Sequence, residues 1–139
     1  MSSSDPLSAA SLDKADYVRL SRFRHRLRRF LRVSERICQD QGLTPLQYQL
    51  LLHVRGDPER DWASIGELAE RLQAQHHGVV ALIDRCERLG LVERRPGLQD
   101  RRVVEIHLLP AGEERLEHVA RLHQDELHHL LQEFARAEG

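Results

Sequence analysis

The fold is decided by residues 64–108, SIGELAERLQAQHHGVVALIDRCERLGLVERRPGLQDRRVVEIHL. Ser64 and Glu67 have the spacing of a capping box, which predicts that a short helix begins here. After a break at residues 73–74, apolar residues at three- and four-residue spacing predict a second helix that stops at Gly90. Two short helices joined by a tight turn are the outline of a helix-turn-helix.

The last part of this stretch has the periodicity of strands. Residues 91–95 and 103–108 alternate in polarity, and the turn residues between them predict a hairpin. Residues 62–63 would add a minimal third strand. A further helix, from the capping signal Thr44-Pro45-Leu46-Gln47 to about Val54, precedes the pair. Three helices followed by a hairpin form the winged-helix arrangement.

Long amphipathic helices are predicted on both sides, from about Leu12 to Gln41 and from about Pro110 onwards as one long final helix. Their apolar stripes are too long for the small middle domain to cover, so we expect them to join two copies in a homodimer. The alternative is a monomer in which they pack only on each other. The expected fold is mainly α with a small β-hairpin wing. Its parts are a disordered arm (1–10), an N-terminal dimerisation helix (11–42), a winged helix-turn-helix DNA-binding domain (43–109) and a C-terminal dimerisation helix (110–139).

Composition narrows the class of protein. A chain of 139 residues with 40% hydrophobic and 31% charged residues suits one folded domain with helical extensions. It contains no membrane-length apolar run, no secretory signal and no catalytic or phosphate-binding motif, so we expect a cytoplasmic protein that is not an enzyme and needs no cofactor. The net charge is only -1, yet eight arginines lie between Arg19 and Arg36, so basic surface is available locally.

Several segments together resemble the MarR family of bacterial transcriptional regulators over about residues 12–135. They are LTPLQYQLL (43–51), IGELAERL (65–72), VVALIDRCERLGLV (79–92), ERRP (93–96), DRR (100–102) and PAG (110–112). The resemblance implies a homodimer that binds a pseudo-palindromic DNA duplex, most often as a repressor released by a small effector. It also implies that the helix at 75–89 enters the major groove and that the hairpin wing reaches the minor groove.

The resemblance and the helical pattern together select a set of DNA-facing residues. Side chains at the start of the groove helix can reach base edges, and Gly78 would allow a close approach of the backbone. In the wing, the family pattern places Arg102 in the minor groove with Asp100 bracing it. The predicted DNA-binding residues are Ser64, Gln75, His76, His77, Gly78, Val80, Ala81, Arg85, Arg94, Arg95, Asp100, Arg101 and Arg102. The alternatives are that the two histidines are merely solvated and that the hairpin arginines only protect a strand edge.

The chain departs from the family pattern at two places. Leu109 stands where a threonine usually caps the last helix, so that cap must be weaker or come from elsewhere. His76-His77-Gly78 replaces the small hydroxyl residues that usually open the groove helix, so the target sequence of better-known members does not transfer.

An effector cleft is expected between the dimerisation helices and the winged domain. The residues suggested for it are Phe23, Leu27, His53 and Trp62. An effector would release DNA by favouring a dimer whose groove helices no longer match half-sites about 34–36 Å apart.

Three other hypotheses remain open. The winged helix could be a protein-interaction module that never binds DNA. Cys38, rather than Cys86, could make the regulator an oxidant sensor, although both lie on apolar faces where a thiol is inert. A metal site is disfavoured because the histidines of the last helix lack ligand spacing among themselves, and solvated surface explains them better. Asp125 with His128 or His129 does have usable spacing, and a dimer could complete such a site. These histidines are His118, His123, His128 and His129, near Asp125 and Glu126.

Overall fold

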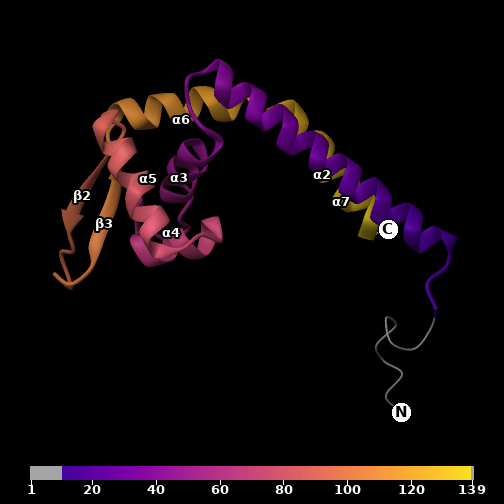
Figure 1. Ribbon diagram of the computed structural model, residues 1–139, viewed down its shortest axis with the longest axis horizontal. Helices are drawn as coiled ribbons and strands as arrows, with labels where there is room; N and C mark the ends of the chain where they lie inside the picture. The colour runs from indigo at the N-terminus through magenta and orange to yellow at the C-terminus, as the bar shows by residue number, and fades with distance from the viewer. Residues whose placement is uncertain (1–10, 139) are drawn as a thin grey trace, which may run out of the picture. The chain divides into compact units, whose positions relative to one another are not determined.

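A computed structural model describes residues 11–138, so the predicted arm over residues 1–10 lies outside the described residues. Figure 1 shows a mainly helical chain with a small sheet, which confirms the predicted fold class. The elements are α2 (Lys14–Asp40), α3 (Pro45–Arg55), β1 (Trp62–Ser64), α4 (Ile65–Leu72), α5 (His76–Arg88), β2 (Val92–Pro96), β3 (Val104–Leu108), α6 (Pro110–Leu122) and α7 (Gln124–Glu138). None of these helices is long and apolar enough to cross a membrane.

The described residues form two compact units. One contains residues 35–123 and therefore holds α3 to α6 with the whole sheet. The other contains residues 11–34, which include most of α2, together with α7.

The sheet of the larger unit has three antiparallel strands in the order β1-β3-β2. The predicted minimal third strand is confirmed, because Trp62 pairs with His107 of β3. Side chains alternate between the two faces of a strand. Ala63 and Ile106 are fully buried in the core, so Trp62, Glu105 and His107 lie on the opposite, outer face.

The core of this unit is built from the apolar faces of α3, α4, α5 and the inner face of the sheet. Its largest fully buried side chains include Leu50, Leu51, Leu68, Ile83 and Ile106. Burial of such side chains contributes roughly 1.5–3 kcal/mol each, which makes this cluster the main source of stability.

Both predicted capping boxes are present. Thr44 Oγ1 accepts a hydrogen bond from the Gln47 backbone N–H at 3.1 Å, and Gln47 Oε1 accepts one from the Thr44 N–H at 3.0 Å. Ser64 and Glu67 make the same reciprocal pair at the start of α4. These short-range bonds fix where α3 and α4 begin.

The turn between α4 and α5 closes on Gln73, whose backbone lies in the left-handed region at φ +51°. Its Nε2 donates to the Glu70 carbonyl at 2.7 Å, which helps hold a conformation that residues other than glycine seldom adopt. After α5, Gly90 lies in the left-handed conformation at φ +73°, which is typical of a glycine that ends a helix.

The prediction of one long final helix was wrong, because it divides into α6 and α7 at His123. The backbone N–H of His123 donates to the Ala120 carbonyl, three residues back, at 3.0 Å. The Val119 carbonyl, four residues back, instead lies 2.8 Å from His123 Nδ1, which must donate to it. The ring also stacks on Tyr48 at 4.7 Å between centroids. Packing of this buried ring therefore interrupts the helical ladder.

The start of α6 is tied to the sheet. Leu109 supplies no side-chain cap, as expected from its apolar side chain, but its N–H donates to the Leu91 carbonyl at 2.9 Å. A Cβ on Gly112 would lie 2.1 Å from that same carbonyl oxygen. Glycine is therefore required at this position of the Pro-Ala-Gly segment.

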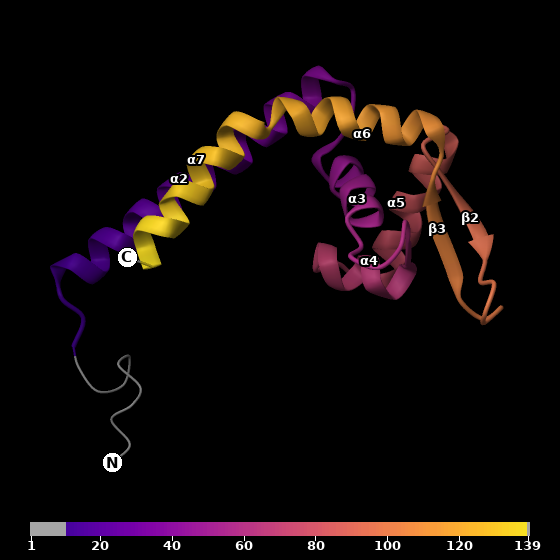
Figure 2. The same cartoon turned by 180° about the vertical axis from the view of Figure 1, so that it is seen from behind.

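In the smaller unit, α2 and α7 run side by side in both views (Figures 1 and 2). Phe23 and Phe134 pack at 5.1 Å between ring centroids, and Arg26 Nη2 lies 2.8 Å from Glu126 Oε2. Many apolar side chains of this unit nevertheless stay exposed. The larger ones are Leu12, Tyr17, Val18, Leu20, Leu31, Leu127, Leu131 and Phe134.

Candidate nucleic-acid interface

The first half of α5 presents one buried and one exposed edge. Val79, Leu82 and Ile83 are buried in the core, as their spacing predicted. The opposite edge contains most of the predicted groove residues. Those exposed are Gln75, His76, His77, Gly78, Ala81 and Arg85, while Val80 is half-buried. The exposed edge carries amide, imidazole and guanidinium groups that can donate or accept hydrogen bonds at base edges.

The N-terminus of α5 lacks a side-chain cap. Gln75 occupies the capping position with extended backbone, but its side chain makes no capping hydrogen bond. A Cβ on Gly78 would meet no atom within 4 Å, so packing within the protein does not require glycine there. A glycine that the protein's own packing does not require is compatible with the prediction that the backbone of α5 approaches a ligand closely at Gly78.

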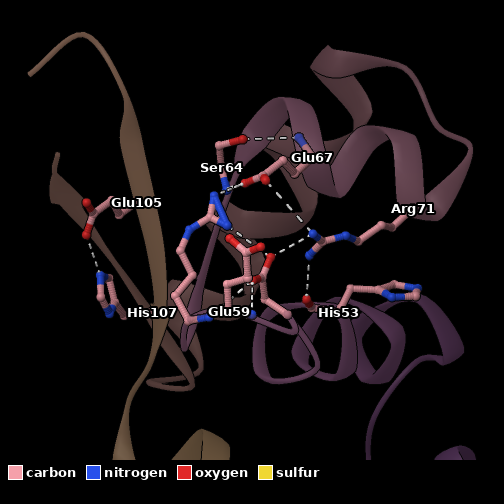
Figure 3. A network of polar contacts seen from close by, with 9 residues as sticks. His53, Glu59, Ser64, Glu67, Arg71, Glu105 and His107 are labelled. Carbon is pink, nitrogen blue, oxygen red and sulfur yellow. Dashed lines mark hydrogen bonds and ion pairs between the residues drawn. The ribbon is translucent and has the colours of Figure 1, made fainter. Parts of the chain in front are cut away.

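The start of α4 is organised differently (Figure 3). The Ser64 hydroxyl, predicted to bind DNA, accepts the Glu67 N–H at 3.2 Å and so already has a structural role. Behind it, Arg71 donates to the His53 carbonyl at 2.9 Å and to Asp57 at 2.8 Å. Arg60 also donates to Asp57, at 3.0 Å. We call Asp57, Arg60, Glu67 and Arg71 the α4 network.

The α4 network perturbs two titratable groups. Arg71, the backbone N–H of Glu59 and Arg60 lower the pKa of Asp57 to about 2. Burial, and then the charge of Arg71, lower the pKa of His53 below its usual value. Sequence analysis missed this network, although the i,i+3 spacing of Asp57 and Arg60 and the i,i+4 spacing of Glu67 and Arg71 were available as signals.

The wing ends in a closed turn. The Gly97 N–H donates to the Val103 carbonyl at 2.8 Å, and the Val103 N–H donates to the Asp100 carbonyl at 3.0 Å. A Cβ on Gly97 would lie 2.2 Å from the Asp100 carbonyl oxygen, so only glycine fits. These two hydrogen bonds fix the backbone of the turn and therefore restrict the directions of the side chains of residues 98–102.

Asp100 holds Arg102 in the manner that the family resemblance implies. Its Oδ1 accepts the Arg102 backbone N–H at 3.0 Å and Nε at 3.1 Å, and Oδ2 accepts Nη2 at 3.2 Å. These bonds lower the pKa of Asp100. The Arg102 side chain is still 91% exposed, and Arg101 beside it is exposed too. A guanidinium oriented by a carboxylate but open to solvent can bind an external anion.

The other two wing arginines are engaged within the protein. Arg94 donates to Asp84 at 2.8 Å and is paired with Glu87, both on α5, so it fastens β2 to that helix. Arg95 is paired with Glu93 on the outer face of the sheet. Their predicted contacts with DNA remain predictions. Arg94 is paired with two carboxylates and Arg95 with one, so the structure supports a DNA contact less well for Arg94 than for Arg95.

The four suggested effector residues are divided between the two units. Phe23 and Leu27 belong to the smaller unit, and His53 and Trp62 belong to the larger one. Within the larger unit, Trp62 lines a cavity beside the wing that His53 does not line.

The cysteines and the histidines of the last two helices differ in how far they are buried. Cys38 and Cys86 are both fully buried, and burial raises the pKa of Cys86 to about 11. His123 is buried, so the expectation that it is solvated was wrong, whereas His118, His128 and His129 are exposed. Among the described residues, no three His, Cys, Asp or Glu side chains are grouped as a metal site would need.

Comparisons with known proteins agree with this architecture. A family model described as the MarR family matches residues 41–103, which run from the end of α2 into the wing. YsmB of Bacillus subtilis, named as an uncharacterized HTH-type transcriptional regulator, is 36% identical over 104 residues, which cover 73% of this chain and 68% of YsmB. The HTH-type transcriptional repressor MdtR of the same organism is 30% identical over 81 residues, covering 58% of this chain and 50% of MdtR.

Solved structures share the fold. A Staphylococcus aureus MepR mutant bound to an oligodeoxyribonucleotide superimposes with a TM-score of 0.64 and 20% identity. The match covers 87% of this chain and 84% of the MepR chain.

Proposed function

Because the chain belongs to the MarR family of HTH-type transcriptional regulators, we propose that it acts as a homodimer that binds a pseudo-palindromic DNA duplex. In this proposal α5 enters the major groove and the wing lies along the adjacent minor groove. The fold neighbour bound to an oligodeoxyribonucleotide and the relative named as a repressor support it.

One observation carries the proposal. The exposed edge of α5 and the exposed, carboxylate-braced Arg102 belong to one compact unit, so both can approach a duplex together. A narrow minor groove concentrates negative potential, which favours a guanidinium inserted there. The helix would supply contacts to base edges, and the wing would sense the shape of the groove.

Dimerisation would pair two such units. The exposed apolar side chains of residues 11–34 and α7 offer the surface, since apolar patches of this kind usually mark association. Repression, and release by a small effector that changes the spacing of the two α5 helices, complete the proposed mechanism.

The test is binding of a fluorescently labelled promoter-length duplex, measured by anisotropy at 50 and 200 mM salt. We expect affinity to fall as salt rises, because arginines displace counterions from phosphate. We expect Arg102→Ala to weaken binding about tenfold, or ~1.4 kcal/mol. Arg121→Ala is the matched control, since Arg121 is also exposed and paired with one carboxylate but lies on α6.

Two results would contradict the proposal. Equal losses of duplex affinity in Arg102→Ala and Arg121→Ala would mean that Arg102 makes no specific contact with the duplex. A dimer by light scattering that shows no affinity for the duplex even at 50 mM salt would favour the protein-interaction module instead.

A further inference from the structure

A cavity of about 420 Å³ lies between the wing turn and the outer face of the sheet. Arg94 on the inner face contacts α5, so strand alternation places this cavity on the other side of the sheet from α5. Among its lining residues are Arg60, Trp62, Leu98, Asp100, Val103 and Glu105. Its volume is in the range of small-molecule binding sites.

Trp62 is the aromatic residue that lines the cavity. The cation that lines it, the guanidinium of Arg60, is already paired with carboxylates. The Arg60 guanidinium lies 3.8 Å from the centre of the Trp62 ring. It also donates to Asp57 at 3.0 Å and to Glu67 at 2.7 Å, neither of which lines the cavity. Arg60 therefore contributes an apolar stem and a paired charge rather than a free anion-binding group.

Two carboxylates give the cavity its polarity. Glu105 is only 6% exposed, and its Oε1 lies 2.8 Å from His107 Nε2. Its Oε2 accepts one long hydrogen bond, from the Leu98 N–H at 3.4 Å, and so retains capacity for a stronger donor. Asp100 lies at the wing end of the same cavity and is paired with Arg102.

We propose that this cavity binds a small planar organic cation, such as an amidinium or ammonium group carried on an aromatic ring. The ring would lie against Trp62 and the apolar side chains of Leu98 and Val103, and the cation would donate to Glu105 and Asp100. A cavity that contains an aromatic ring and two carboxylates favours such ligands over anions and over neutral analogues.

Occupancy of the site would weaken DNA binding through the wing. A cation that bonds to Asp100 competes for the oxygens that orient Arg102. This part of the inference rests on the proposed function, whereas binding in the cavity does not. The two are therefore tested separately.

The binding test uses the fluorescence of Trp62, which is the only tryptophan in the chain. Benzamidine, benzamide and benzoate have similar shapes but are cationic, neutral and anionic. At constant ionic strength and without DNA, we expect saturable quenching by benzamidine alone. Quenching that is equal for all three compounds, or linear without saturation, would overturn the proposed site.

Substitutions of the two carboxylates test whether they bind benzamidine. We expect Glu105→Gln to weaken benzamidine binding at least fivefold, while Glu117→Gln, an exposed glutamate on α6, leaves it unchanged. Circular dichroism checks that Glu105→Gln is folded. Should it unfold, Asp100→Asn decides, because Asp100 is at the surface and its loss should also weaken binding at least threefold. Unchanged affinity in a folded variant would overturn the proposal.

The coupling test repeats the duplex titration with saturating benzamidine against benzoate at equal ionic strength. We expect a loss of at least threefold in duplex affinity for the wild type and none for Arg102→Ala. Saturable binding of benzamidine with unchanged duplex affinity would retain the site and refute the coupling. Absence of duplex binding under any condition would instead contradict the proposed function.

Discussion

The two helices of the helix-turn-helix begin in opposite ways. At α4 the first backbone N–H groups are satisfied by Ser64 and Glu67, with Asp57, Arg60 and Arg71 packed behind them. At α5 the capping residue Gln75 makes no side-chain cap, and the first turn is exposed. Free N–H groups and the helix dipole favour anions at such an end. The difference separates a helix start that stabilises the unit from one that is exposed and has no side-chain cap.

The largest effect should come from Arg71→Ala. This change removes the hydrogen bonds to the His53 carbonyl and to Asp57 and leaves a carboxylate without its main partner. We expect a loss of about 2 kcal/mol in the free energy of unfolding by urea, since bonds to charged groups have this magnitude. Arg85→Ala, the control on the exposed edge of α5, should change stability by less than ~0.5 kcal/mol but should weaken DNA binding. The reverse pattern would refute the division of roles.

A smaller effect is expected at the two capping positions. Ser64→Ala deletes an observed capping bond and should cost about 1 kcal/mol of stability, read from thermal or urea unfolding. Gln75→Ala deletes none and should be close to neutral. Equal losses in the two variants would show that Gln75 caps α5 in solution.

The smallest effect concerns pH. The pKa of His53 is lowered in the folded protein, so protons bind more tightly to the unfolded chain. Stability should therefore decline as the pH falls below about 6.5 towards the lowered pKa of the folded state. His53→Gln should reduce the difference between urea midpoints at pH 7 and pH 5.5, and His118→Gln, an exposed control, should not. An unaltered difference in His53→Gln would assign the pH dependence to other groups.

Much of the fold was predictable because its signals are local. The capping boxes at Thr44 and Ser64, the glycine at position 90 and the alternation of the hairpin each involve residues only a few positions apart. The exposed edge of α5 followed from the same helical period. The brace between Asp100 and Arg102 followed from the family resemblance and is present in the structure.

The remaining features depend on contacts between residues that are distant in sequence. No residue close to His123 in the sequence predicts the break between α6 and α7, because the break depends on stacking of the His123 ring against Tyr48. The bond from Arg71 to Asp57 spans fourteen residues, and that from Arg94 to Asp84 spans ten. Periodicity cannot predict such partners, and so it also cannot predict the cavity beside the wing.

The left-handed turn at Gln73 has a thermodynamic consequence. Because that turn is already closed by hydrogen bonds in the free protein, α4 and α5 are held at a set angle before any duplex arrives. Association then requires no coil-to-helix transition in this motif. We expect calorimetry to give a modest negative heat capacity change that reflects surface removed from water, without the large increment typical of segments that fold as they bind.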